Sequence, residues 1–566
     1  MLGKWMAAAL LTAAAISLLG CGSAYESRWV ETTHPAADQS APVYQSPRLY
    51  ESAESEPSAA LLPPADEGMG PGQGGDKYDL IEENIFLATI DSPLSTFSID
   101  VDTASYAKTR MYLLEHHRPP PPDAVRIEEL VNYFDYDYAP PTDHQPFAVH
   151  IETAPCPWQP KHHLARIGIK GRELNERRPP SNLVFLIDVS GSMDYPNKLP
   201  LVIRSMKMLV RQFDENDRVA IVVYAGAAGM VLPATHGDDR QTILGALDRL
   251  HAGGSTNGGQ GIHRAYQAAL DNYIPGGVNR VILCTDGDFN VGATSTAELV
   301  RLAETNAKAG VFLSVLGFGM GNHNDAMLEQ ISNKANGNYA FIDSDAEAHK
   351  VLVEQISGTL VTIAKDVKIQ VEFNPARVAA YRLIGYENRK LAARDFNDDQ
   401  KDAGEIGAGH RVTALYELIP AGDEDQQPPS EVDALKYQQQ PKLSAAGSSN
   451  EWLTLKLRYK LPDAGKSQLV TVPVTGSGDQ FGDASTDFRF AAAVASFGML
   501  LRDSEFKGSA TYGDVLEIAA AAIVSDKHGY RAEFLELVRQ ARQLSPEAQA
   551  SSLPTSRIAG GVPAGG

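Results

Sequence analysis

Apolar segments of strand length alternate with segments of helical periodicity between residues 182 and 360, and this alternation limits the chain to few folds. Strands are expected at Leu183–Asp188, Val219–Tyr224, Arg280–Thr285, Val311–Gly317 and Tyr339–Ile342, with a short antiparallel edge at Gly229–Leu232. Helices are expected at 198–213, 239–250, 259–272, 296–309, 324–333 and 345–362. Because such alternation builds βαβ units, the sequence predicts an α/β fold, a doubly wound and mainly parallel sheet with helices on both faces.

Segments with the two-residue alternation of half-buried strands lie on both sides of this region. They are Phe147–Ile151 and Leu164–Ile169 before it, and Val367–Phe373, Arg411–Leu418 and Trp452–Tyr459 after it. We expect the two β-rich flanks to pair as one domain around an inserted α/β unit, so that the strands near 147–151 and 367–373 share a sheet. A further strand is expected at Leu94–Asp100, and helices at 105–114, at 126–134 and over much of 484–542.

The first strand of the α/β region ends in an acidic residue that two hydroxyl side chains follow, in the order Asp188-Val189-Ser190-Gly191-Ser192. Gly191 allows a tight turn, so these oxygen atoms are expected at the carboxyl end of the strand, where open α/β sheets bind ligands. A cluster of oxygen donors favours a hard divalent cation, Mg²⁺, Mn²⁺ or Ca²⁺, over Zn²⁺. The alternative is a strand followed by an ordinary helix N-cap.

Two later segments add further oxygen donors to the Asp188-x-Ser190-x-Ser192 pattern. Thr256 follows a Gly-Gly-Ser sequence before a helix, and Asp286 follows the apolar strand that ends at Thr285. In this order the residues resemble the metal-ion-dependent adhesion site of the von Willebrand factor type A (VWA) family, in which Asp-x-Ser-x-Ser precedes a Thr and an Asp on a sheet of this topology. The resemblance implies a VWA fold and a metal site formed by Asp188, Ser190, Ser192, Thr256 and Asp286.

The resemblance also implies a function. Two carboxylates only just neutralise a divalent ion and hydroxyl ligands add no charge, so in this family the ion keeps an open position for an outside ligand, usually a carboxylate of a partner protein. We therefore expect a bound divalent cation, Mg²⁺ before Ca²⁺ or Mn²⁺, and a partner protein that offers an acidic residue. Asp194 and Asp288 lie near the site in sequence and are expected to be solvated loop residues that do not bind the metal directly; the alternative is that they tune its affinity.

Two other functions remain open at this point. A metal-assisted hydrolase would need a general base beside the ion, and the sequence names none, because no histidine is placed to activate Ser190 or Ser192. A structural protein of the cell envelope would use the metal only to stabilise its fold. We expect a binding protein that is not an enzyme, and no catalytic residue is assigned.

The amino terminus has the features of a secretory signal peptide. Lys4 precedes an apolar stretch from Trp5 to Leu19, which is too short to span a membrane comfortably. The stretch ends in Leu18-Leu19-Gly20-Cys21, which resembles a bacterial lipobox and implies cleavage before Cys21 and lipid attachment to its thiol. We therefore expect an extracytoplasmic, lipid-anchored protein, in the outer membrane of a cell with two membranes, because Gly22 rather than Asp follows the cysteine. The alternative is an ordinary signal peptide with an incidental cysteine.

Charge and cysteine content add limits on partners and cross-links. The net charge of −21, from 50 basic and 71 acidic residues, argues against binding to nucleic acid. Besides Cys21, the chain has only Cys156, between two prolines, and Cys284, inside an apolar run. No zinc-binding spacing is present, and a bridge between these two cysteines is possible in an oxidising compartment.

The resemblance extends beyond the α/β region. Phe97–Tyr106 and Ala124–Phe134 are similar to the amino-terminal region of bacterial lipoproteins that carry a VWA domain, and Asp402–His410 is similar to their carboxy-terminal region of unknown function. The expected organisation is a signal peptide (1–20), a lipid-anchored flexible linker (21–76), an N-terminal α/β region (77–140), a β segment (141–180), the VWA domain with its metal site (181–362), a β-rich region (363–478), a helical region (479–545) and a disordered tail (546–566).

Overall fold

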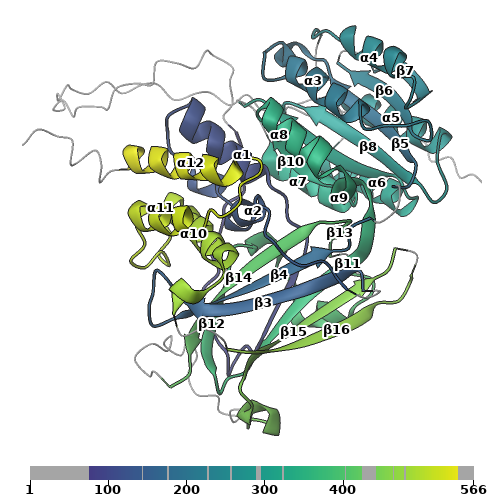
Figure 1. The fold of residues 1–566 in the computed structure, drawn as a ribbon. Coiled ribbons are helices and arrows are strands. Elements are labelled where there is room, and N and C mark those ends of the chain that lie inside the picture. The colour runs from purple at the N-terminus through teal and green to yellow at the C-terminus, as the bar shows by residue number, and fades with distance from the viewer. Residues whose placement is uncertain are drawn as a thin grey trace, which may run out of the picture. The chain divides into compact units, whose positions relative to one another are not determined.

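A computed structural model describes most of the chain as one six-stranded α/β sheet, two antiparallel sheets and a group of helices (Figure 1). The described residues are 76–142, 145–174, 178–225, 228–254, 258–287, 295–320, 324–401, 403–422, 442–462, 464–476 and 480–545. The expected signal peptide, Cys21, all but the last residue of the linker and the expected tail lie outside them. Over these described ranges, no helix is both long enough and apolar enough to cross a membrane.

The α/β sheet has the strand order β10-β9-β8-β5-β6-β7. Its strands are β5 (Ser181–Asp188), β6 (Arg218–Tyr224), β7 (Gly229–His236), β8 (Val278–Thr285), β9 (Phe312–Phe318) and β10 (Tyr339–Ile342). All neighbours pair in parallel except β6 and β7, which pair antiparallel at the edge. The five predicted parallel strands and the predicted antiparallel edge are confirmed.

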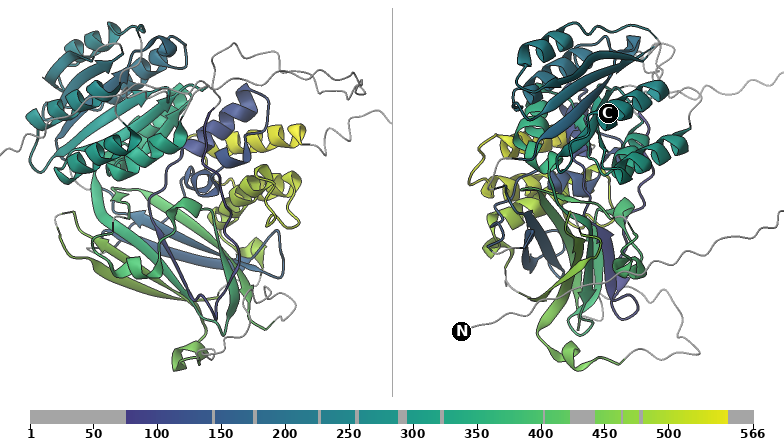
Figure 2. Two further views of the ribbon diagram at one scale, coloured as in Figure 1. Left: turned by 180° about the vertical axis from the view of Figure 1, so that it is seen from behind. Right: turned by 90° about the vertical axis from the view of Figure 1, so that its right-hand side faces the viewer.

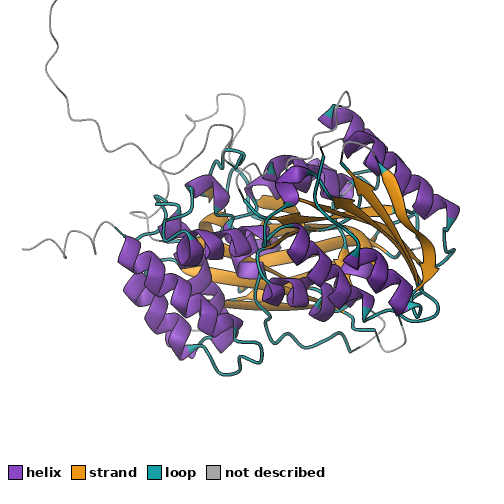
Figure 3. Ribbon diagram, turned by 90° about the horizontal axis from the view of Figure 1, so that it is seen from above, coloured by secondary structure: helices purple, strands orange, loops and turns teal. Residues whose placement is uncertain are grey.

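Helices cover both faces of this sheet (Figure 3). They are α3 (Leu199–Val210), α4 (Arg240–Asp248), α5 (Gly258–Asp271), α6 (Thr296–Lys308), α7 (Asp325–Lys334) and α8 (Asp345–His349). Alternate residues of β5 enter different cores: Phe185 packs with α3 and α4, whereas Leu186 packs with α5, α6 and α7. Because side chains of a strand point alternately to its two faces, this division confirms the predicted doubly wound fold.

The prediction of one continuous helix over 345–362 is wrong. In place of one helix over 345–362, the chain forms α8, a π-helical turn at Lys350–Glu354 and the short helix α9 (Ile356–Leu360). The extra residue of a π turn changes which side chains face inward. It accompanies a buried contact, since the ammonium group of Lys350 donates a 2.6 Å hydrogen bond to the carbonyl of Tyr133. Periodicity in the sequence does not report such a tertiary contact.

The β-rich flanks form two sheets that pack face to face around a common apolar core (Figure 2). One sheet has the order β1-β12-β14-β4-β3, and the other contains β13, β11, β15 and β16 in order, with β2 paired to β11. Their strands are β1 (Leu87–Ala88), β2 (Leu94–Ser98), β3 (Phe147–Pro155), β4 (His163–Gly171), β11 (Thr362–Phe373), β12 (Val378–Ile384), β13 (Ile406–Gly407), β14 (Arg411–Pro420), β15 (Glu451–Lys460) and β16 (Gln468–Thr475).

The prediction that the strands near 147–151 and 367–373 share a sheet is wrong. β3 pairs with β4 in one sheet, and β11 lies in the other. Both sheets nevertheless combine strands from before and after the α/β region, because β4 pairs with β14 and β2 pairs with β11. The strands β12 and β16 were not predicted. A buried arginine, Arg382, interrupts the apolar pattern of β12, and β16 is an exposed edge strand that contains Pro473.

The carboxy-terminal helices pack against the amino-terminal ones. α10 (Thr486–Leu501), α11 (Tyr512–Ala521) and α12 (Tyr530–Leu544), in yellow and yellow-green in Figure 1, lie beside α1 (Ala104–Arg110) and α2 (Ile127–Asn132). α1 continues as a π-helical turn over Met111–Glu115. Arg110 joins three parts of the chain, because its guanidinium binds Asp343 after β10, Glu347 of α8 and Glu533 of α12. The predicted helical carboxy-terminal region is confirmed.

The contact between α9 and β13 leaves no room for a side chain at Gly407. A Cβ atom there would lie 1.7 Å from the carbonyl oxygen of Gly358. We expect Gly407→Ala to lower the melting temperature of the full chain by several degrees, because overpacking against backbone costs about 3 kcal/mol. Gly465→Ala is the matched control, since nothing lies within 4 Å of a Cβ atom at Gly465. Thermal unfolding by circular dichroism measures both, and equal melting temperatures would contradict the close contact.

Candidate metal site

The predicted site lies where the strand order of the α/β sheet reverses. From β5 the chain passes to β6 and β7 on one side and later to β8, β9 and β10 on the other. Ile187 of β5 lies beside Cys284 of β8, so Asp188, which ends β5, and Asp286, which follows β8, leave the sheet at the same edge. Open α/β sheets bind ligands at this point because the loops after the two strands diverge.

The loop after β5 brings the two serines together. The backbone N–H of Ser190 donates a 2.8 Å hydrogen bond to Oδ1 of Asp188, and a single 3-10 turn over Gly191–Met193 follows. The Oγ atoms of Ser190 and Ser192 are 3.0 Å apart. Asp188, Ser190 and Ser192 therefore form one cluster of oxygen donors.

A second loop lies against this cluster. The N–H of Gly191 donates to the carbonyl of Gly254 at 3.0 Å, and the N–H of Gly253 donates to the carbonyl of Val189 at 2.8 Å. Gly254 has a φ of +92°, which a residue with a side chain rarely adopts. These bonds hold the start of the loop that leads to Thr256 beside the serines. Thr256 itself lies outside the described residues.

Both carboxylates are buried. Asp188 is 0% exposed and Asp286 is 3% exposed. Burial raises the pKa of Asp188 to about 6, the hydrogen bonds from Ser190 oppose this, and the nearby charge of Asp286 raises it further. Oδ2 of Asp188 has no hydrogen-bond partner within 3.5 Å among the described residues, although the nearby hydroxyl of Tyr224 also acts to lower the pKa of Asp188. A buried carboxylate with an unused oxygen and a second carboxylate nearby favours a bound cation.

A lysine that sequence reasoning missed contacts the site. Nζ of Lys198 donates a 2.9 Å hydrogen bond to Oδ2 of Asp286. Its aliphatic chain passes over Gly319, where a Cβ atom would lie 2.5 Å from Cε of Lys198. Lys198 directly precedes α3, ten residues after Asp188. This position is the only feature of the sequence that could indicate a contact with the site, because lysine is not an oxygen ligand of metal ions.

The donor set fits a hard divalent ion. Asp188, Ser190, Ser192 and Asp286 offer carboxylate and hydroxyl oxygens, which Mg²⁺ and Ca²⁺ prefer and which Zn²⁺ binds less readily than nitrogen or sulfur. In the described part of the chain, no three His, Cys, Asp or Glu side chains gather to hold a metal ion. An ion here would therefore depend on hydroxyl and water ligands. That these residues bind metal remains a prediction.

Both remaining cysteines are free and buried, so the possible bridge between Cys156 and Cys284 does not form in this structure. Burial raises the pKa of the Cys284 thiol well above its usual range, as it does for Cys156. Neither thiol is therefore a reactive group under ordinary conditions.

Three families match different parts of the chain. Residues 182–356 match the family described as von Willebrand factor type A domain, and residues 73–166 match one described as von Willebrand factor. Residues 358–544 match the family described as uncharacterized protein YfbK, C-terminal. The first match confirms the predicted VWA fold of the α/β region.

The chain is also similar to whole proteins and to solved structures. Uncharacterized protein YfbK of Escherichia coli (strain K12) is 43% identical over 476 residues, which are 83% of this chain and 81% of that protein. Inter-alpha-trypsin inhibitor heavy chain H3 of Bos taurus is 28% identical over 196 residues, which are 32% of this chain and 22% of that protein. The solved structure of von Willebrand factor type A from Catenulispora acidiphila is 16% identical, covers 72% of this chain and 91% of its own, and has a TM-score of 0.39.

Lys198 places a positive charge where a metal ion would bind Asp286. We expect Lys198→Met to strengthen Mg²⁺ binding by about 10-fold, because a nearby unit charge opposes a cation by one to a few kcal/mol. Isothermal titration calorimetry on the full chain measures this. Lys207→Met is the control. It removes an ammonium of α3 that pairs with Asp248 of α4, and this variant should bind Mg²⁺ as the natural protein does. Weaker Mg²⁺ binding by Lys198→Met would mean that the lysine orients Asp286 instead of competing for it.

Proposed function

The chain belongs to the family of the Escherichia coli protein YfbK, and from this premise we propose that it binds a partner protein through a divalent metal ion held by Asp188, Ser190, Ser192, Thr256 and Asp286. VWA domains commonly serve metal-dependent interactions between proteins. The observation that carries the proposal is the meeting of two buried carboxylates and two hydroxyls at the switch point of the sheet.

The charges of the site support capture of an acidic group. Two carboxylates cancel the charge of a divalent ion, and the serine hydroxyls add none. The proposed ion therefore remains a Lewis acid with room for one more anionic ligand. Of the donors that proteins offer, a carboxylate of Asp or Glu on the partner satisfies this position best. We propose Mg²⁺ as the ion, because it keeps several waters and needs few protein carboxylates, with Ca²⁺ and Mn²⁺ as the alternatives.

The proposed activity is binding without catalysis. A hydrolase at this ion would need a group that removes a proton from water or from a serine. The nearest basic side chain that the structure places at the site is Lys198, whose ammonium is already bound to Asp286. An ammonium group has only N–H donors and no lone pair, so this side chain offers no acceptor for a proton.

The first test removes one charge from the site. Asp188→Asn should abolish the rise in melting temperature that Mg²⁺ causes in the natural protein, because the ion loses a charged ligand. In EDTA the variant should melt at the same temperature or higher, because burial disfavours the ionised carboxylate above pH 6, the approximate pKa of Asp188. Differential scanning fluorimetry and calorimetry measure the two effects. Asp194→Asn is the matched control, since Asp194 is near in sequence but not in the proposed ligand set.

A second test asks whether binding of a partner protein depends on the metal ion. Crosslinked pull-downs from intact cell envelopes should recover a partner in Mg²⁺ with the natural protein and with Asp194→Asn, and should fail in EDTA or with Asp188→Asn. Unchanged Mg²⁺ affinity in Asp188→Asn would defeat the assignment of the ligands. A partner that is retained in EDTA while the domain melts at a lower temperature would favour a metal with a purely structural role.

We also propose that the protein is a lipoprotein of the cell envelope, anchored through Cys21. The proposal rests on Lys4, the apolar stretch from Trp5 to Leu19 and the lipobox-like sequence that ends at Cys21. A lipid anchor adds about 0.8 kcal/mol of membrane affinity for each buried CH₂ group. Where the cell has two membranes, Gly22 after the cysteine favours the outer one.

Cys21→Ser should prevent the incorporation of radiolabelled palmitate and release the protein from the membrane fraction. Ser23→Ala, which changes a neighbour outside the lipobox-like sequence, should leave both unchanged. Labelling followed by fractionation measures the two properties together. A Cys21→Ser protein that still carries the label and sediments with membranes would show that the cysteine is incidental.

A further inference from the structure

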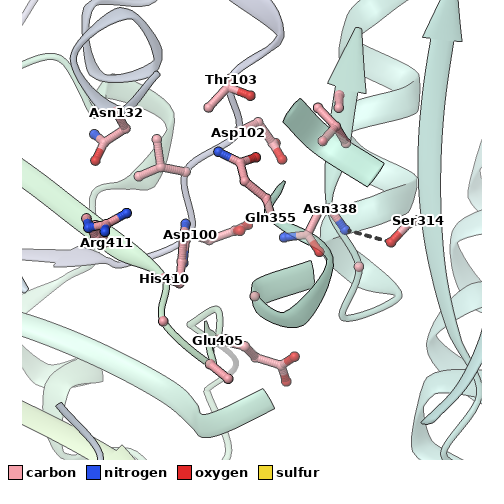
Figure 4. A pocket seen from close by; sticks show the side chains of 18 of the residues that line it. Asp100, Asp102, Thr103, Asn132, Ser314, Asn338, Gln355, Glu405, His410 and Arg411 are labelled. Atoms are coloured by element: carbon pink, nitrogen blue, oxygen red, sulfur yellow. Dashed lines mark hydrogen bonds between the residues drawn. The ribbon is translucent and has the colours of Figure 1, made fainter. Parts of the chain in front are cut away.

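Figure 4 shows residues that line a polar cavity of about 410 Å³. Its strand residues place it at the other end of the α/β sheet from the proposed metal site. Arg280 of β8 and Ser314 of β9 line it from the amino-terminal halves of their strands. Gln355, from the segment between the π turn and α9, forms another wall, as does the segment 404–411, which contains β13 and the start of β14. The volume is in the range of pockets that hold small organic ligands.

Arg280 is the unusual residue of this cavity. It is 2% exposed, and its guanidinium donates a 2.5 Å hydrogen bond to Oγ of Ser314 and lies 5.6 Å from the ring centroid of Phe312. Its Nε has no hydrogen-bond partner among the described residues, and none of their carboxylates lies within ion-pairing distance of it. A guanidinium has five N–H donors, and of these the described chain engages Nη1 through Ser314 and leaves Nε without an acceptor.

The charge of Arg280 is buried, and no carboxylate of the described residues forms an ion pair with it, although Glu405 lines the same cavity. Burial lowers the pKa of Arg280 to about 10, against the opposing effect of Glu405, so the group stays charged at neutral pH. A buried charge is costly unless it is paired and hydrogen-bonded. A negatively charged hydrogen-bond acceptor would therefore satisfy both the free N–H group and the charge of Arg280.

The other charges near the cavity are largely paired with one another. Asp100 and Asp102 both bind Arg389. Lys170 binds Glu173, and Arg411 binds Asp135. Burial lowers the pKa of His410 to about 4, so this ring is neutral at pH 7. Among the described residues, Arg280 is therefore the cation of this cavity that has no ion-paired carboxylate, and Glu405 also lines the cavity (Figure 4).

Ser314 extends the donor set. Its Oγ accepts from Arg280 and, at 3.3 Å, from the backbone N–H of Asn338 (Figure 4). A hydroxyl that accepts two hydrogen bonds still has its own proton to donate. Ser314 can therefore place this proton beside the guanidinium, and together they resemble the donor pairs that hold carboxylate and phosphate groups.

We propose that this cavity binds a small molecule through one oxyanion group, a carboxylate or a phosphate, which pairs with Arg280 and accepts a hydrogen bond from Ser314. The site is separate from the proposed metal site, so its occupancy does not require the metal. The cavity leaves room beyond the oxyanion for the rest of the ligand.

Calorimetric titration of the full chain in EDTA, with inorganic phosphate in one arm and acetate in the other, tests the proposal. Each titration is compared with chloride at the same ionic strength. The natural protein and Asp188→Asn should bind at least one of the two anions with one-to-one stoichiometry, and the arm that binds identifies the class of oxyanion. Arg280→Met should lose about 10-fold or more in affinity, as expected for hydrogen bonds to a charged group. Arg218→Met, on the same sheet but not lining the cavity, should bind like the natural protein.

A second variant keeps the test decisive if Arg280→Met fails to fold. Ser314→Asp supplies a carboxylate beside the guanidinium from within the chain, so it should raise the melting temperature and abolish binding of the added anion. Binding of neither anion by the natural protein, or equal binding by Ser314→Asp, would overturn the proposal. A lower melting temperature of Ser314→Asp would also overturn it, because it would mean that Arg280 is already balanced.

Discussion

The parallel pairing of β5 with both β6 and β8 is the constraint on which the proposed metal site depends. The chain leaves β5 toward one side of the sheet and later returns to its other side at β8, so the loops that follow β5 and β8 diverge. Asp188 and Asp286 thereby come together although 98 positions separate them in the sequence. In a sheet with another strand order the same residues would be ordinary acids at strand ends, and the two serines would be an ordinary turn.

Ion pairs as well as apolar contacts of α1 join the α/β region to the rest of the protein. Arg110 binds acids of α8 and α12, and Arg389 binds Glu329 of α7 together with Asp102. Lys108 of α1 pairs with Asp325 at the start of α7. Loss of one partner from such a pair leaves the other charge buried, which costs about 3–5 kcal/mol.

The sequence predicts what local pattern determines. The five parallel strands are runs of apolar residues, and the order Asp188, Ser190, Ser192 is contained in five positions. It does not predict what distant contacts determine. Arg382 lies inside β12 because Glu417 of the neighbouring strand neutralises it, and no pattern within β12 reveals that partner. The contact of Lys198 with Asp286 and the isolation of Arg280 depend in the same way on residues far along the chain.

Lys198 and Arg280 place positive charge at the two ends of the same sheet. Their surroundings differ in how freely each side chain can move away. The ammonium of Lys198 is a compact charge on a flexible chain whose side chain is 13% exposed, so it can turn toward water and leave both carboxylates to a metal ion. The guanidinium of Arg280 lies against Phe312 and is bound to Ser314, so it cannot leave without breaking these contacts. At the proposed metal site, a metal ion could therefore replace the ammonium of Lys198. In the cavity, the guanidinium of Arg280 stays in place, and an anion that neutralises it would have to enter from outside. The two proposed sites at opposite ends of the doubly wound sheet therefore differ in the charge of the ligand that each would accept.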